Sequence, residues 1–133
     1  MRLGVTADRT STEQPLDASM PTAGQMVEEV RGVLAALADP TRRQLLDVLV
    51  DTGRASATTL AGQLPVSRQA VVKHLQVLEA AGLVERVRAG REVLYSARPD
   101  PLDASARWLA DLSAAWDRRL DALKQAADPA IND

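Results

Sequence analysis

The chain has 133 residues, the size of a single domain with a modest tail, and its 46% hydrophobic and 26% charged residues are close to the averages of folded globular proteins. It has no cysteine and one histidine, which excludes disulfides and thiol chemistry and gives no set of imidazoles for a transition metal. It has no apolar run of about 18 residues and no signal-peptide pattern, so we expect a cytoplasmic protein without a membrane partner.

Charge is distributed unevenly along the chain, although the net charge is only −2. Residues 1–66 carry 6 Lys and Arg against 8 Asp and Glu, residues 67–98 carry 6 against 3, and residues 99–133 carry 4 against 7. Positive charge is therefore concentrated in one internal segment. Such a local basic surface is typical of a small nucleic-acid-binding protein.

The N-terminal residues 1–20 show no hydrophobic period and are rich in polar residues, which predicts a disordered leader. A start site placed too far upstream explains the leader equally well, because Met20 and Met26 lie near the beginning of the first periodic segment. We expect the folded domain over 21–128 and a flexible tail over 129–133.

Two amphipathic helices are predicted first. Thr22 and Gln25 form a T-x-x-Q capping box before apolar residues that recur every three or four positions, which predicts a helix over 23–37. Asp39-Pro40 then provides an N-cap and a proline at the first helical position, which predicts a second helix ending near 51–53.

Two shorter segments follow and predict a helix-turn-helix. Ser56 caps a helix from 57 to about 63, and a turn containing proline interrupts the pattern at 64–66. Ser67 caps another helix over 68–81, which the following glycine ends. A short helix, a tight turn and a second helix are the parts of a helix-turn-helix.

The last elements complete a winged version of this motif. Runs rich in Val, Leu and Tyr at 83–88 and 92–97, joined by Ala89-Gly90-Arg91, predict a β-hairpin. Asp100-Pro101 repeats the cap-plus-proline pattern and begins a final helix of about 26 residues. The predicted fold is mainly α with a small β-hairpin, a winged helix-turn-helix in the order α-α-α-α-β-β-α.

The second helix of the motif has two different faces. On a wheel at about 100° per residue, Val71, Leu75 and Leu78 form the core side, and polar residues lie opposite. In a helix-turn-helix the outward N-terminal half of this helix enters the major groove, and wing arginines lie over the minor groove or flanking phosphates. The predicted residues in contact with double-stranded DNA are Ser67, Arg68, Gln69, Val72, Lys73, His74, Gln76, Arg86, Arg88 and Arg91.

Structural alternatives exist for these residues. The polar helix face and the hairpin arginines are also typical of an ordinary solvated surface. Val72, which we place at the centre of the polar face, either touches a thymine methyl group or sugar or is a tolerated exposed valine. For His74, between the two faces, the alternatives in order are packing with a backbone partner, a phosphate contact and metal ligation.

The terminal helices predict a homodimer. The apolar stripe of the last helix is longer than a small helical core covers, so part of it is expected to pack against a second copy, with Trp108 and Trp116 as large anchors. The alternative is a last helix that folds back on its own domain. A two-fold dimer predicts an inverted-repeat operator. The predicted interface residues are Met26, Val30, Val33, Leu109, Leu112, Trp116, Leu120 and Leu123.

Several segments resemble the ArsR-type winged-helix repressors. The residues LADPTRR at 37–43, followed by Leu45-Leu46, are similar to the family's signature at the start of its second helix. The family's recognition helix resembles VSRQAVVKHL at 66–75, and the segment after that helix resembles LEAAGLV at 78–84. The family's wing resembles Gly90-Arg91 followed by Tyr95. The resemblance covers about 28–127.

This resemblance implies a homodimeric repressor, assembled through its first and last helices, that blocks transcription at its operator and often represses its own gene. The chain departs from the family's metal sensors, because 57–61 has no cysteine and the last helix has no histidine. Metal sensing is therefore not carried over, and we expect no cofactor. Val72 replaces the family's usual serine, so the operator sequence is not carried over either.

Two other classes of function compete with this one. A winged-helix module that binds an acidic protein partner, without DNA specificity, is the chief rival. An enzyme is least expected, because the sequence shows no acid/base pair, activated nucleophile or phosphate-binding glycine loop. No polar constellation indicates an effector site.

Overall fold

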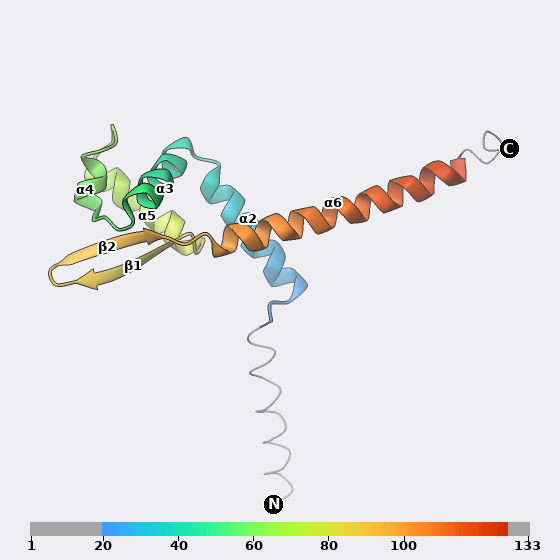
Figure 1. Ribbon diagram of the computed structural model, residues 1–133, viewed down its shortest axis with the longest axis horizontal. Helices are drawn as coiled ribbons and strands as arrows, with labels where there is room; N and C mark the ends of the chain where they lie inside the picture. The colour runs from blue at the N-terminus through green and yellow to red at the C-terminus, as the bar shows by residue number, and fades with distance from the viewer. Residues whose placement is uncertain (1–19, 128–133) are drawn as a thin grey trace, which may run out of the picture.

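The computed structural model of the protein describes residues 20–127, so nearly all of the predicted leader and the predicted tail lie outside the described residues. The mainly helical fold with one β-hairpin is confirmed, in the predicted order (Figure 1). The described elements are α2 (Ala23–Leu37), α3 (Pro40–Thr52), α4 (Ala57–Ala61), α5 (Arg68–Ala80), β1 (Val84–Ala89), β2 (Glu92–Ala97) and α6 (Asp100–Ala127).

The helix caps expected from the sequence are present at the first four of these helices. Thr22 and Gln25 make the capping box, with reciprocal backbone to side-chain bonds of 2.8 and 3.1 Å. Asp39 Oδ1 accepts from two backbone N–H groups at the start of α3, at 2.7 and 3.2 Å. The hydroxyls of Ser56 and Ser67 each accept from the backbone N–H three residues further on, at 3.1 Å. These local bonds set where each helix begins.

Two helix boundaries differ from the expected ones. The helix α4 ends at Ala61 because the N–H of Gly62 turns back to the carbonyls of Thr58 and Thr59, which tightens the last turn. Asp100 is the first residue of α6 rather than its cap. The carbonyl of Pro99 accepts the first backbone bonds of α6 instead, at 2.9 and 3.1 Å.

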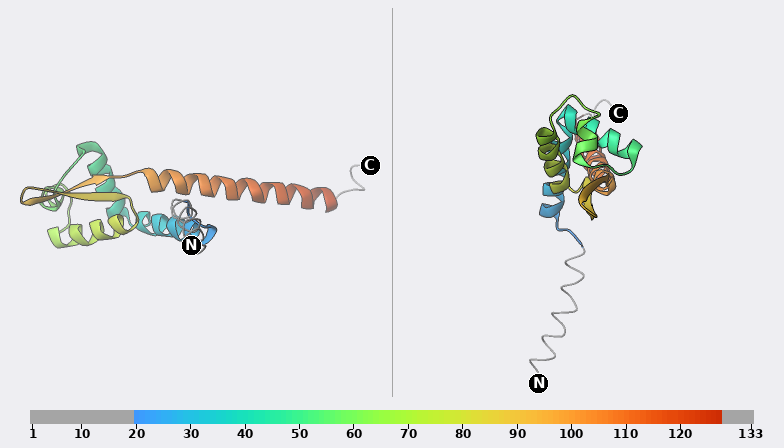
Figure 2. Two further views of the ribbon diagram at one scale, coloured as in Figure 1. Left: turned by 90° about the horizontal axis from the view of Figure 1, so that it is seen from below. Right: turned by 90° about the vertical axis from the view of Figure 1, so that its left-hand side faces the viewer.

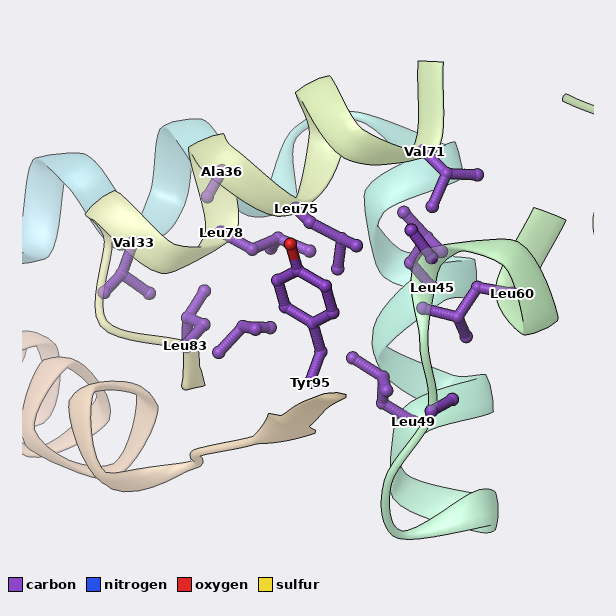
Figure 3. Close-up of a cluster of buried hydrophobic side chains, with 13 residues drawn as sticks. Val33, Ala36, Leu45, Leu49, Leu60, Val71, Leu75, Leu78, Leu83 and Tyr95 are labelled. Carbon is purple, nitrogen blue, oxygen red and sulfur yellow. The ribbon is translucent and has the colours of Figure 1, made fainter. Parts of the chain in front are cut away.

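The hairpin is joined to the helical domain through its second strand. Tyr95 in β2 exchanges two backbone hydrogen bonds with Ala55, at 2.8 and 3.0 Å, and its side chain is buried. Figure 3 shows the Tyr95 ring among the leucines of α3 and α5. The other buried side chains of this core are Val33, Ala36, Leu45, Leu49, Ala55, Ala57, Leu60, Val71, Leu75, Leu78, Leu83 and Val84.

The helix α6 extends well beyond this core. Its first half packs against α2, and its second half projects away from the rest of the described chain (Figure 1). Figure 2 shows the hairpin at the end of the molecule opposite to the C-terminal end of α6. No helix within residues 20–127 is both long and apolar enough to cross a membrane.

Candidate nucleic-acid interface

The helix α5 presents one buried face and one polar face. Val71, Leu75 and Leu78 are completely buried in the core, as the wheel predicts. The side chains of Gln69, Lys73 and Gln76 are exposed on the other side. Together with Ser67, Arg68, Ala70 and Val72 they line one open depression. The polar face is therefore accessible from Arg68 to Gln76 of α5.

The expected position of Val72 requires a correction. Val72 is half-buried and packs against the core instead of standing at the centre of the polar face. At about 100° per residue it lies roughly 90° from the middle of the core side, so it is on the flank of the helix. Its burial explains the apolar residue without a DNA contact, and any contact with a base would involve only its exposed edge.

The start of α5 is tied to α4. Arg68 Nε donates to Thr58 Oγ1 at 3.0 Å, which links the two helices of the helix-turn-helix by their side chains. The Ser67 hydroxyl accepts from the backbone N–H of Ala70, so its oxygen is already engaged in capping. Both residues lie at the helix N-terminus, where the backbone N–H groups and the helix dipole favour an anion.

His74 has a side-chain partner instead of the expected backbone partner. The ring is half-buried, and its Nδ1 lies 3.4 Å from Nη1 of Arg42 in α3. Arg42 is a residue that the sequence pattern did not single out for the site. Arg42 is the first arginine of the LADPTRR segment, and this segment was the available sequence signal for it. Only the fold brings Arg42 next to α5.

The wing arginines share one face of the hairpin, as their spacing predicts. Arg86 is paired across the strands with Tyr95 and Arg88 with Val93, which puts both arginines on the side of the hairpin that carries the buried tyrosine. Arg86 Nε lies 3.3 Å from Glu79 of α5, so this arginine is partly neutralised. Among residues 20–127, the salt bridges involve neither Arg88 nor Arg91.

A charged cluster joins the wing to the start of α6. Arg98 pairs with Glu85 of β1 and lies 3.5 Å from Asp100. The hydrogen bond to Glu85, followed by the contact with Asp100, raises the pKa of Arg98. Sequence reasoning did not identify this cluster, because Glu85 meets Arg98 only when the hairpin closes.

The predicted dimer residues divide into three groups by their exposure to solvent. The side chains of Trp116, Leu120 and Leu123 are 54%, 61% and 66% exposed, and Leu109 is also exposed, although all four are large and apolar. Leu112 and Met26 are half-buried. The expectation for Val30 and Val33 is corrected, since both are buried within the subunit and have no surface to offer to a partner. The large apolar residues of α2 that are exposed are Val27 and Leu34, which the sequence pattern did not distinguish.

Comparisons with known proteins agree with this architecture. A helix-turn-helix domain model matches residues 37–87. The HTH-type transcriptional regulator Rv2034 of Mycobacterium tuberculosis is 41% identical over 93 residues, which are 70% of this chain and 83% of the relative. The transcriptional repressor SdpR of Bacillus subtilis is 31% identical over 80 residues, which are 60% of this chain and 88% of the relative.

Solved structures give the same result. An ArsR-like transcriptional regulator from Rhodococcus sp. RHA1 matches with a TM-score of 0.69 and 50% identity, over 76% of this chain and 94% of that one. The homodimeric winged helix-turn-helix DNA-binding domain Mb0332 from Mycobacterium bovis matches with a TM-score of 0.53 and 29% identity, over 71% of this chain and 83% of that one.

The helix-turn-helix followed directly by a two-stranded hairpin defines a winged helix-turn-helix protein. The sequence relatives then place it more narrowly. The chain belongs to the ArsR-type family of winged helix-turn-helix transcriptional regulators.

Proposed function

We propose that this regulator binds double-stranded DNA as a homodimer and represses transcription at an inverted-repeat operator, including one at its own gene. The observation that carries the proposal is the exposed polar face of α5, on which Gln69, Lys73 and Gln76 line one depression. Amide side chains pair with adenine in the major groove, and cations pair with guanine or phosphate. The hairpin packs against the same helix through β1.

The position of the wing also supports DNA binding through α5. In Figure 2 the hairpin runs alongside α5, with its tip toward the end of the molecule that is opposite to the C-terminal end of α6. Arg88 and Arg91 are exposed on the outer part of this hairpin. Side chains of this kind bind phosphates or enter the minor groove, while the helix reads the major groove. Arg86 is a weaker candidate because Glu79 pairs with it.

The second half of α6 supports the homodimer. Leu109, Trp116, Leu120 and Leu123 form an exposed apolar stripe on a helix that projects from its own domain (Figure 1). Monomers rarely expose a contiguous apolar surface of this kind. If two copies of α6 pack antiparallel about a two-fold axis, the middle of the stripe lies near Trp116. The similar Mb0332 domain is homodimeric, which also supports a dimer.

The remaining assignments are part of the same proposal. We propose that the domain spans 21–128 and that the protein acts in the cytoplasm, where a regulator of this class meets chromosomal DNA. Occupation of a promoter by a dimer blocks polymerase, and the relative SdpR is named as a transcriptional repressor, which supports repression. We infer no metal requirement, because the chain has no cysteine and its one histidine lies in α5, outside α6.

The test is selection of duplexes from a random pool by the purified full-length protein, followed by footprinting of the promoter of its own gene. We expect an enriched inverted repeat whose half-sites are about one helical turn apart, bound at least about 10³-fold better than scrambled duplex. Analytical ultracentrifugation is expected to give a dimer. A strictly monomeric protein, or one that enriches no sequence, would overturn the proposal and favour a protein-interaction module.

A further inference from the structure

Arg42 uses its whole guanidinium group to join three elements. Its Nε donates to the carbonyl of Ala36 at 2.7 Å, and its Nη2 donates to the carbonyl of Ala35 at 3.2 Å. Its Nη1 lies 3.4 Å from Nδ1 of His74 and 3.9 Å from Oδ2 of Asp39. The side chain is only 17% exposed. Such a set of contacts fixes both the position and the plane of the group.

The carbonyls that Arg42 binds lie in the last turn of α2. The last four carbonyls of a helix lack partners within the helix, and an arginine that donates to them also favours the negative end of the helix dipole. The far side of the same guanidinium reaches His74 of α5. Arg42 therefore links the end of α2 to α5, the proposed recognition helix.

The chemistry of this link favours one histidine tautomer, because the 3.4 Å contact is a hydrogen bond only when Nδ1 of His74 accepts. A guanidinium group only donates hydrogen bonds, so Nδ1 of His74 accepts and carries no proton. The proton of the neutral ring is then on Nε2, because the bond made by one ring nitrogen decides the state of the other. The two ring nitrogens point away from each other, so the Nε2–H group is directed away from Arg42.

His74 follows Lys73 in the sequence, and among the hydrogen bonds of residues 20–127 none uses its Nε2. We propose that Arg42 is a positioning residue for DNA binding, which holds His74 in the Nε2–H form so that it donates to a DNA phosphate. This inference rests on the proposed function. It also means that the orientation of the His74 side chain on α5 depends on the C-terminal end of α2, through Arg42.

A purely structural role for Arg42 makes different predictions. In that case, substitution of Arg42 lowers stability but leaves the affinity of the folded dimer for DNA unchanged, and His74 is dispensable. The protein contains a single histidine, so the imidazole ¹⁵N spectrum reports His74 alone. Recorded well above the ordinary histidine pKa of about 6.5, this spectrum shows which nitrogen carries the proton.

The binding experiment uses the duplex that the wild-type protein selects from a random pool, and a scrambled duplex of the same composition. The amide nitrogen of glutamine lies about where Nε2 does, whereas the amide group of asparagine lies about where Nδ1 does. We therefore expect His74→Asn to weaken binding to both duplexes about tenfold and His74→Gln to weaken it less than about threefold.

Arg42→Lys removes the planar guanidinium group that contacts both α2 and His74. We expect it to lower the affinity for both duplexes about tenfold. The two residues act through one contact, so their effects are not expected to add. We expect the affinity of the double variant Arg42→Lys with His74→Asn to be within about threefold of that of each single variant. Arg31→Lys is the matched control, since Arg31 is an exposed arginine of α2 whose salt bridge within residues 20–127 is with Glu28, and we expect no change in affinity.

Three results would overturn the inference: a wild-type spectrum with the proton on Nδ1, a His74→Asn variant that binds as the wild type does, or losses that simply add in the double variant. If Arg42→Lys does not fold, the two His74 variants and the wild-type ¹⁵N spectrum still test whether His74 donates from Nε2. A wild-type protein that selects no sequence overturns the proposed function, whereas normal selection with additive losses overturns only the role of Arg42.

Discussion

Gly82 is a residue whose backbone conformation decides a turn. Its φ of +79° is left-handed, and the N–H groups of Gly82 and Leu83 return to the carbonyls of Glu79 and Leu78, at 2.9 and 3.0 Å, as in a Schellman motif. This turn directs the chain from α5 into β1. The junction therefore sets the angle between the recognition helix and the wing.

We expect Gly82→Ala to lower the free energy of unfolding by about 1–2 kcal/mol, because a Cβ atom disfavours this φ and would lie 3.2 Å from Cγ of Pro101. Gly32 is the matched control. It lies within α2 with open space where a Cβ atom would be added, so Gly32→Ala is expected to stabilise by about 0.5–1 kcal/mol. Urea denaturation at a fixed protein concentration measures both. Equal effects of the two variants would contradict the strain at Gly82.

Two neighbouring residues on α5 are expected to affect DNA binding in different ways. Lys73→Ala removes a charge that any phosphate attracts, so it weakens binding to all duplexes about equally. Gln69→Ala removes a side chain that reads a base, so it relaxes the preference at particular positions. Repeated selection from a random pool with each variant measures this, with Gln44→Ala on exposed α3 surface as the control. An unchanged selected sequence for Gln69→Ala would contradict its role.

At the scale of the element, Asp39 connects pH to the stability of α3. The backbone N–H of Arg42 is the main cause that lowers the pKa of Asp39, helped by the N–H of Thr41. A carboxyl group with a lowered pKa in the folded state stabilises the fold above its unfolded pKa of about 3.9, and this contribution is lost as the pH falls through the folded value.

We therefore expect the stability of the wild type to fall more steeply below about pH 4 than that of Asp39→Asn, which keeps a capping oxygen but does not titrate. Denaturation by urea at a series of pH values from 7 to 3 gives the difference between the two curves. Other carboxyl groups contribute to both curves equally. Parallel curves would show that this cap does not contribute to the pH dependence.

The helix α6 makes a separate prediction about assembly. Trp116→Ala is expected to raise the dimer dissociation constant at least about 30-fold, because a large aromatic near a two-fold axis is buried by both subunits. Asp111→Ala, an exposed substitution on the other side of the same helix, is expected to leave the constant unchanged. Sedimentation equilibrium measures both constants. A Trp116→Ala protein that stays fully dimeric at low concentration would place the interface elsewhere.

At the scale of the whole molecule, an acidic chain with one basic surface is expected to bind DNA in a strongly salt-dependent way. A dimer that neutralises about six phosphates gives a slope near −5 for the logarithm of the binding constant against that of the salt concentration. Lys73→Ala is expected to flatten this slope by about one unit for each subunit in contact with DNA. Fluorescence anisotropy titrations from about 50 to 200 mM salt measure the slope. A flat dependence would favour a module that binds a protein partner.

Sequence alone determined the elements and their order, because the signals for these features are local. The capping side chains of Thr22, Asp39, Ser56 and Ser67 bond to backbone groups two or three residues away. The buried face of α5 follows from helical periodicity alone. These bonds and spacings need no knowledge of distant parts of the chain.

Only the tertiary structure decided which side chains are left on the surface and which pair at a distance. Val30 and Val33 are buried because α2 packs inside its own subunit, and Val72 is half-buried because the core reaches the flank of α5. Arg42 meets His74 across 32 positions of sequence, and Arg86 meets Glu79 only after the chain turns from α5 into β1. Each of these contacts depends on how the helices and strands pack against one another. The periodicity of the sequence does not carry that information.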